Sequence, residues 1–150
     1  MISKVSTFVL MFLLLIFTCC GPKSGKNGTL ASKIKFKQYY INGKRLYIEQ
    51  CSNCHQKDGS GLARLYPPIN NSDYFKSGPD STICIIRNGI EGEIILNGIS
   101  YNQPMPGHQN LTVLEIAELV TYLYSAWGEE DRVFSTGEVS KILENCLLNH

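Results

Sequence analysis

The sequence predicts a small, mainly α-helical domain that carries one short β-hairpin. The helical prediction depends most on residues 111–128, where apolar side chains recur at the spacing of one helix face. The hairpin is predicted from Asn97 and Gly98, because an Asn-Gly pair between short apolar stretches favours a two-residue turn. Once an amino-terminal targeting segment is subtracted from its 150 residues, the chain is long enough for one hydrophobic core and too short for two.

Residues 1–20 have the pattern of a targeting segment. A short basic start precedes an apolar run over residues 5–17, which is too short for a comfortable membrane span. The run ends in Thr-Cys-Cys-Gly, which resembles the lipobox of bacterial lipoproteins and makes Cys19 or Cys20 the expected lipid attachment site. An uncleaved anchor and an ordinary cleaved signal are the alternatives. Each version places the folded part in the cell envelope, on the periplasmic side of the cytoplasmic membrane.

Residues 21–38 are expected to form a flexible basic linker, because their first half is rich in Gly, Ser, Lys and Asn. Seven basic residues after the targeting segment precede the first acidic residue, Glu49: Lys23, Lys26, Lys33, Lys35, Lys37, Lys44 and Arg45. Such a tether can touch anionic headgroups, although a solvated linker is the preferred interpretation. Loss of the targeting segment removes Lys4 and leaves 13 of the 14 basic residues against 13 acidic ones. This balanced charge does not indicate nucleic-acid binding.

The folded domain is expected over residues 39–128, followed by an extension over 129–150 that packs on it. Asn42 is a candidate amino-terminal cap for a helix in which five side chains follow helical spacing: Leu46, Tyr47, Gln50, Cys51 and Cys54. A shorter helix is expected over 81–88 and should end at Gly89. In the last helix, Thr112 and Glu115 form a capping box and Gly128 follows as a stop.

The motif Cys51-Ser52-Asn53-Cys54-His55 carries the chemistry of the chain. A C-x-x-C-H sequence is the attachment site of a c-type haem, in which both thiols bind porphyrin vinyl groups and the imidazole ligates iron. Residues spaced in this way share one helix face and can meet one flat macrocycle. A thioredoxin-like dithiol and half of a zinc site are the alternatives. They are disfavoured because no βαβ pattern precedes the motif and no second C-x-x-C or H-x-x-x-H follows it.

Residues 43–128 resemble the class I monohaem cytochromes c. Four motifs occur in that family's order: Gly43-x-x-x-Tyr47-x-x-x-Cys51-x-x-Cys54-His55, Gly59-Ser60-Gly61-Leu62 with Tyr66-Pro67-Pro68-Ile69, Tyr101-Asn102-Gln103-Pro104-Met105-Pro106, and Leu119-Val120-Thr121-Tyr122-Leu123. The resemblance implies a small cytochrome c fold, with helices around one covalently bound haem and the hairpin before a distal methionine loop. The targeting segment adds the expectation of a membrane-anchored lipoprotein type.

The resemblance also implies roles for single residues. Met105 is expected as the sixth iron ligand, with a packing methionine as the alternative and His108 as the rival ligand. Pro67 or Pro68 is expected to offer its carbonyl to the Nδ1 proton of His55, which orients the ring. Gly43 and Tyr122 are expected where the first and last helices cross.

Cys84 and Cys146 remain after the haem and lipid sites are assigned. In an oxidising compartment the two thiols are expected to form a disulfide that fastens the carboxyl-terminal extension to the short helix. Two buried or independently reactive cysteines are the alternative, because connectivity does not follow from sequence.

These features predict one-electron transfer between a donor and an acceptor protein of a respiratory chain. A haem with His and Met ligands leaves no open iron position, so the chain is expected to be an electron carrier and not an enzyme. A haem c subunit of a larger respiratory oxidase, nitrite reductase or dehydrogenase complex is the alternative. A haem-based sensor with a displaceable Met105 is a third class.

Overall fold

The structure is a computed structural model that describes residues 27–128 and 130–146. The chain divides into two compact units, residues 1–32 and residues 33–150, and the description below concerns the second unit unless stated. The predicted targeting segment, with Cys19 and Cys20, lies outside the described residues. No helix among the described residues is long and apolar enough to cross a membrane.

The first described helix, α2 (Asn27–Gln50), corrects two expectations. From Asn27 onward, the predicted flexible linker is helical and mostly exposed. Beyond Gly28 the linker holds no glycine or proline, and its Leu, Ala, Lys and Gln residues favour helix. Asn42 does not cap a helix but lies inside one, and its Nδ2 donates a hydrogen bond to Glu118 Oε1 at 2.7 Å. A long-range partner therefore outweighs the local capping preference of Asn42.

The last helix of the predicted domain, α5 (Val113–Trp127), begins and ends as its sequence predicts. The Thr112 hydroxyl accepts a hydrogen bond from the Glu115 amide, and the Glu115 carboxylate accepts one from the Thr112 amide, so the capping box is formed. Glu115 has a lowered pKa because its carboxylate accepts hydrogen bonds from Thr112. Gly128 follows the helix, and its amide donates to the Tyr124 carbonyl.

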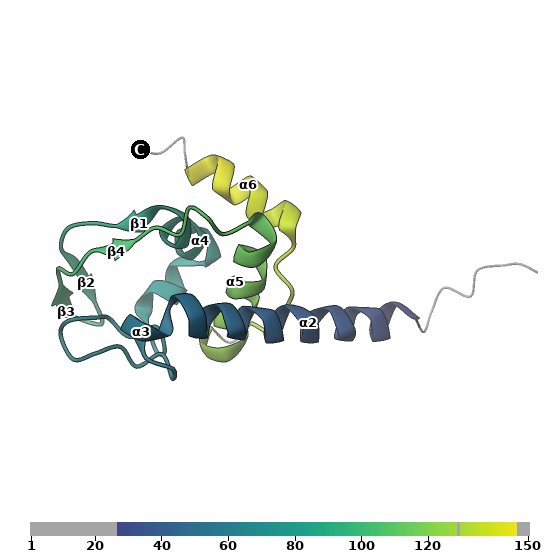
Figure 1. Cartoon of the computed structure of the whole chain (residues 1–150), viewed down its shortest axis with the longest axis horizontal. Helices are drawn as coiled ribbons and strands as arrows, with labels where there is room; N and C mark the ends of the chain where they lie inside the picture. Colours follow the sequence, from purple (N-terminus) through teal and green to yellow (C-terminus); the bar gives the residue numbers. More distant parts are fainter. Residues whose placement is uncertain (1–26, 129, 147–150) are drawn as a thin grey trace, which may run out of the picture. The chain divides into compact units, whose positions relative to one another are not determined.

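Figure 1 shows α2 running past α5. Aromatic rings from both helices pack together at this contact. Gly43 lies at the contact, because a Cβ atom there would approach the Glu118 carbonyl oxygen to 2.0 Å. The Tyr122 ring lies 5.3 Å from the ring of Tyr40 and 5.7 Å from that of Tyr47, centroid to centroid. The predicted helix crossing at Gly43 and Tyr122 is thus confirmed.

Between the C-x-x-C-H motif and α5 the chain forms a 3-10 helix, a longer α-helix and two small antiparallel strand pairs. The 3-10 turn η2 (Asp73–Ser77) precedes α4 (Pro79–Asn88), which begins two residues earlier than expected and is followed by Gly89 as predicted. Strand β1 (Gly89–Ile90) pairs with β4 (Met105–Pro106), so that Ile90 lies opposite Met105.

The predicted hairpin is present as β2 (Ile94–Leu96) and β3 (Ile99–Tyr101), with Leu96 paired to Ile99. Asn97 and Gly98 have φ angles of 51° and 74°, the left-handed values that a type I′ turn requires. Asn97 also ties the turn to η2, because Asp73 and Asn97 exchange two hydrogen bonds of 3.1 Å. The mainly α-helical fold with a small hairpin is therefore confirmed.

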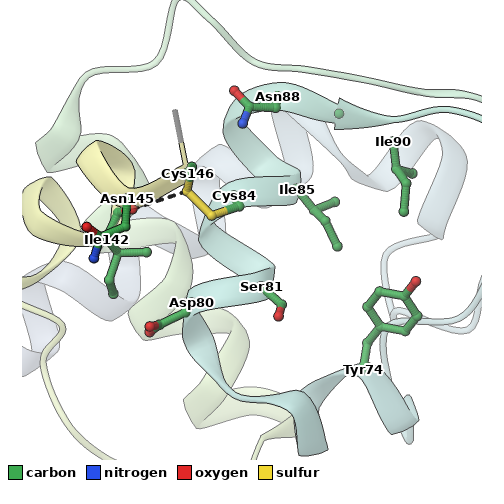
Figure 2. A pocket seen from close by; sticks show the side chains of 11 residues that line it. Tyr74, Asp80, Ser81, Cys84, Ile85, Asn88, Ile90, Ile142, Asn145 and Cys146 are labelled. Carbon is green, nitrogen blue, oxygen red and sulfur yellow. Dashed lines mark hydrogen bonds between the residues drawn. A yellow bond between two sulfur atoms is a disulfide. The ribbon is translucent and has the colours of Figure 1, made fainter. Parts of the chain in front are cut away.

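The carboxyl-terminal extension forms α6 (Thr136–Cys146), which packs on α4 and α5. Phe134 and Val139 are fully buried in the same core as α5. The Thr121 hydroxyl accepts a hydrogen bond from the Phe134 amide at 3.1 Å. Figure 2 shows a disulfide between Cys84 of α4 and Cys146 of α6, whose α carbons lie 5.7 Å apart. The extension is therefore fastened to the domain by apolar packing and by a covalent bond.

Candidate functional site

The C-x-x-C-H motif lies at the break between two helices. Cys51 follows α2 and serves as the N-cap residue of the short helix α3 (Ser52–His55). The Cys51 carbonyl accepts hydrogen bonds from the amides of Cys54 and His55, at 3.2 and 3.0 Å. Because these bonds close one helical turn, the three side chains leave the backbone on one side, as the spacing requires.

Both thiols of the motif are unpaired. Burial, followed by the proximity of Cys54, raises the pKa of the Cys51 thiol to about 12. Reactive dithiols of the thioredoxin type need a lowered thiol pKa, so this environment argues against that alternative. Among the described residues, no group of three His, Cys, Asp or Glu side chains is arranged to hold a metal ion.

The His55 imidazole is buried and oriented by one hydrogen bond. Its Nδ1 donates to the Pro67 carbonyl oxygen at 2.9 Å, so Pro67 and not Pro68 supplies the oxygen. Burial lowers the pKa of His55, and the bond to Pro67 opposes this in part. A neutral ring with its proton on Nδ1 leaves the Nε2 lone pair as the metal-binding atom.

The loop over residues 56–70 places Pro67 against His55. The Gly61 amide donates to the His55 carbonyl at 2.9 Å, and Gly61 has a φ angle of 69°. A Cβ atom at Gly61 would lie 2.4 Å from the Tyr66 carbonyl oxygen and 2.6 Å from the carbonyl carbon of Pro67. The loop can therefore close on His55 only because residue 61 has no side chain.

Tyr47 closes the other side of the same loop. Its hydroxyl donates a hydrogen bond of 2.6 Å to the carbonyl of Gln56, the residue that follows His55. Burial raises the pKa of Tyr47, so the hydroxyl keeps its proton and remains a donor. The sequence predicts Tyr47 by its helical spacing and as part of the first family motif, and it contains no signal for this hydrogen bond.

Met105 lies in β4, which is drawn above α3 in the view of Figure 1. Its side chain is half-buried, and its backbone is held by the pairing with Ile90. A Cβ atom at Gly89 would lie 2.4 Å from the Met105 carbonyl oxygen, so the end of α4 touches this segment closely. The rival ligand His108 is also half-buried, which lowers its pKa, and its amide donates to the Ile86 carbonyl.

A separate hollow of about 510 Å³ opens beside the disulfide, between α4 and α6. In Figure 2, Cys146 lines the hollow at the left, and Tyr74, Ile85 and Ile90 line it further to the right. The lining contains none of the six predicted haem residues, which are Cys51, Cys54, His55, Pro67, Pro68 and Met105. The hollow is therefore no guide to where a haem lies.

Comparison with known proteins identifies the family. The Cytochrome c family model matches residues 40–127, which is more than half of the chain. The chain belongs to the cytochrome c family. It is 29% identical to cytochrome c-552 of Thermus thermophilus over 110 residues, which cover 67% of this chain and 83% of that protein. It is also 30% identical over 93 residues to the cytochrome c subunit of a quinone alcohol dehydrogenase from Gluconacetobacter polyoxogenes, covering 60% of this chain and 19% of that subunit.

Membership of the cytochrome c family implies a covalently bound haem c and a role in electron transfer. The described residues fit that group. Cys51 and Cys54 are unpaired thiols one helical turn apart, and His55 presents a neutral imidazole whose Nδ1 is already occupied. The haem supplies the redox chemistry when bound, and the protein supplies the attachment, the ligands and the surroundings.

Proposed function

We propose that this cytochrome c carries single electrons between two redox proteins of a respiratory chain, as a class I monohaem protein held in the cell envelope. The orientation of His55 carries the proposal. A buried imidazole, fixed through Nδ1 and preceded by two free thiols, is suited to hold one haem and unsuited to acid–base chemistry. The sequence contains one C-x-x-C-H motif, which supports a single haem.

His55 and Met105 are the proposed axial ligands. The antiparallel pairing with Ile90 and the neighbouring Pro104 and Pro106 hold the Met105 backbone extended. A thioether ligand stabilises ferrous iron relative to ferric iron, and two protein ligands leave no position for a substrate. Together these points support electron transfer over ligand sensing.

Covalent attachment is tested by mass spectrometry of protein matured with cytochrome c assembly factors. The chain should carry one haem that acid-acetone does not extract, and replacing Cys51 and Cys54 together with alanine should abolish attachment. The matched control replaces Cys84 and Cys146 together with serine, which should leave the haem bound. Extractable haem in the unmodified chain contradicts the proposal.

The axial ligand is tested by comparing Met105→Ala with His108→Ala. Met105→Ala should shift the ferric spectrum toward high spin, remove the Met-to-iron charge-transfer band and lower the potential, because the thioether is gone. His108→Ala should change none of these. The opposite pattern assigns the sixth ligand to His108. If the unmodified protein lacks the Met-to-iron charge-transfer band, a haem-based sensor is favoured over an electron carrier.

A haem c subunit of a larger oxidoreductase, such as a respiratory oxidase, nitrite reductase or dehydrogenase complex, is the second candidate function. The similarity to the cytochrome subunit of a quinone alcohol dehydrogenase supports it, although the match covers only 19% of that subunit. Purification from native membranes under mild conditions separates the two candidates. A stoichiometric partner dehydrogenase or oxidase identifies a subunit, and a chain that purifies alone identifies a carrier.

The envelope location is proposed from the targeting segment, with Cys19 or Cys20 as the lipid-bearing residue. Intact mass and peptide mapping of the mature protein test it. A diacylated amino-terminal peptide beginning at one of these cysteines supports a lipoprotein. A free amino terminus downstream of Cys20 supports a cleaved signal, and an unprocessed residue 1 supports an uncleaved anchor.

A further inference from the structure

Helix α2 carries apolar side chains on two opposite sides, and one of these sides is an exposed line of isoleucines. Ile34, Ile41 and Ile48 have relative exposures of 49%, 53% and 37%, and together they form what is called here the isoleucine face. Seven residues correspond to nearly two helical turns, so the three side chains lie along one line of the helix. The opposite side of α2, with Gly43, Leu46 and Tyr47, is buried against the rest of the domain.

Basic residues border the isoleucine face. Lys37 and Lys44 each follow an isoleucine by three residues, so both are neighbours of the isoleucines on the helix surface. Lys33 precedes Lys37 by four residues and extends the same basic edge by one turn. Their side chains are exposed, and none of them forms an ion pair within the described residues. Arg45 differs, because it forms a salt bridge of 2.8 Å with Glu49. The border of the face is therefore positively charged.

We propose that the isoleucine face lies in the headgroup region of an anionic membrane, with α2 parallel to the surface. An interfacial helix combines an apolar strip with lysines whose long stems reach back to the phosphates. A second copy of this chain is a poorer occupant, because two such faces would bring Lys33, Lys37 and Lys44 against like charges. The inference rests on the proposed envelope location, and it adds a second membrane contact, through α2, to the proposed lipid anchor at the amino terminus.

The orientation has a consequence for electron transfer. Because α2 leads directly into Cys51, a helix that lies in the membrane plane keeps the haem attachment site at a fixed height above the surface. A tether alone leaves the domain free to rotate. A docked α2 instead presents the same side of the domain to redox proteins of that membrane.

The test uses the full haem-loaded chain on two kinds of vesicle, phosphatidylcholine alone and phosphatidylcholine with phosphatidylglycerol. Acetylation rates of single lysines are measured by mass spectrometry. On the anionic vesicles Lys37 and Lys44 should react about fivefold more slowly, the factor that corresponds to roughly 1 kcal/mol per lysine at a charged surface. Lys57 and Lys141, which are exposed elsewhere on the domain, should react equally on both vesicles.

Matched variants separate docking from tethering. Ile41→Ser combined with Ile48→Ser should restore the acetylation rates of Lys37 and Lys44. Ile95→Ser combined with Leu114→Ser removes two exposed apolar side chains from other surfaces and should leave the protection intact. Haem content and vesicle binding are recorded in the same samples, so a failure of docking is distinguishable from a failure of haem attachment or anchoring.

Three outcomes overturn the inference. Equal lysine rates on both vesicles, with the chain bound and its haem attached, show that the chain is tethered without docking. Protection that persists in the Ile41→Ser, Ile48→Ser variant shows that the isoleucines do not insert. Protection that rises with protein density on uncharged vesicles assigns the face to a second copy.

Discussion

Gly43→Ala should destabilise the protein through the contact between α2 and α5. The new methyl group would lie 2.0 Å from the Glu118 carbonyl oxygen and 2.8 Å from the Tyr122 Cβ, so one helix must move. Overpacking of this kind costs about 3 kcal/mol, the upper end of its usual range, because backbone atoms stand in the way. The better helix propensity of alanine returns about 1 kcal/mol. The free energy of unfolding should therefore fall by about 2 kcal/mol.

Urea unfolding followed by far-ultraviolet circular dichroism measures this change. With an m-value of about 2 kcal/mol/M, the Gly43→Ala midpoint should fall by about 1 M. Gly137→Ala is the matched control, because the added methyl group in α6 meets nothing within 4 Å apart from its chain neighbours and the backbone of its own helix. That variant should gain about 0.5 kcal/mol from reduced freedom of the unfolded chain. Equal midpoints for the two variants would refute the crossing of α2 and α5 at Gly43.

Two further predictions concern the tail and the histidine. Replacing Cys84 and Cys146 together with serine should lower the free energy of unfolding by about 4 kcal/mol in the chain-entropy model, given their separation of 62 residues. Calorimetry measures this loss, and two thiols that alkylate without prior reduction in the unmodified protein contradict the bridge. Gly61→Ala should cost about 1–2 kcal/mol for its left-handed backbone and roughly a further 1–3 kcal/mol for the clash of the new methyl group with the backbone of Tyr66 and Pro67. The same change should move the Pro67 carbonyl away from His55 and so make the imidazole less basic. A less basic imidazole stabilises ferric iron less, so the reduction potential of the haem should rise. A redox titration that finds no shift contradicts this link.

The elements that the sequence predicts well are those with a complete local signal. The capping box needs only Thr112 and Glu115, three residues apart, and the hairpin turn needs only Asn97 and Gly98. Side-chain and backbone preferences decide both without help from distant parts of the chain. The haem motif has the same local character, because its three side chains occupy one helical turn.

The expectations that differ from the structure depend on distant partners. Asn42 resembles a cap in isolation, but its partner Glu118 lies 76 residues further along the chain. Asn97 is predictable as a turn residue, whereas its two hydrogen bonds to Asp73 are not. Phe134 has no periodic neighbours that indicate burial, yet it is fully buried once α6 folds back on α5. Tertiary contacts of this kind are beyond any local pattern.

The start of α2 differs for another reason. The linker prediction weighed the Gly, Ser and Lys content of residues 21–33, although the glycines end at Gly28 and the helix continues from there. A basic composition with good helix formers is compatible with either a solvated coil or an exposed helix. The linker itself contains only Ile34 of the isoleucines that recur every seven residues, so no local pattern within it distinguishes the two.

The contacts that hold the fold together are also those that orient the candidate iron ligand. The Tyr47 ring packs against Tyr122 and Trp127 at the contact of α2 with α5. The hydroxyl of the same residue fixes the carbonyl of Gln56, which is bonded directly to His55. A change that separates α2 from α5 therefore shifts the backbone on which the imidazole is mounted. We expect stability and reduction potential to vary together in variants of this crossing, and independently in variants of α6.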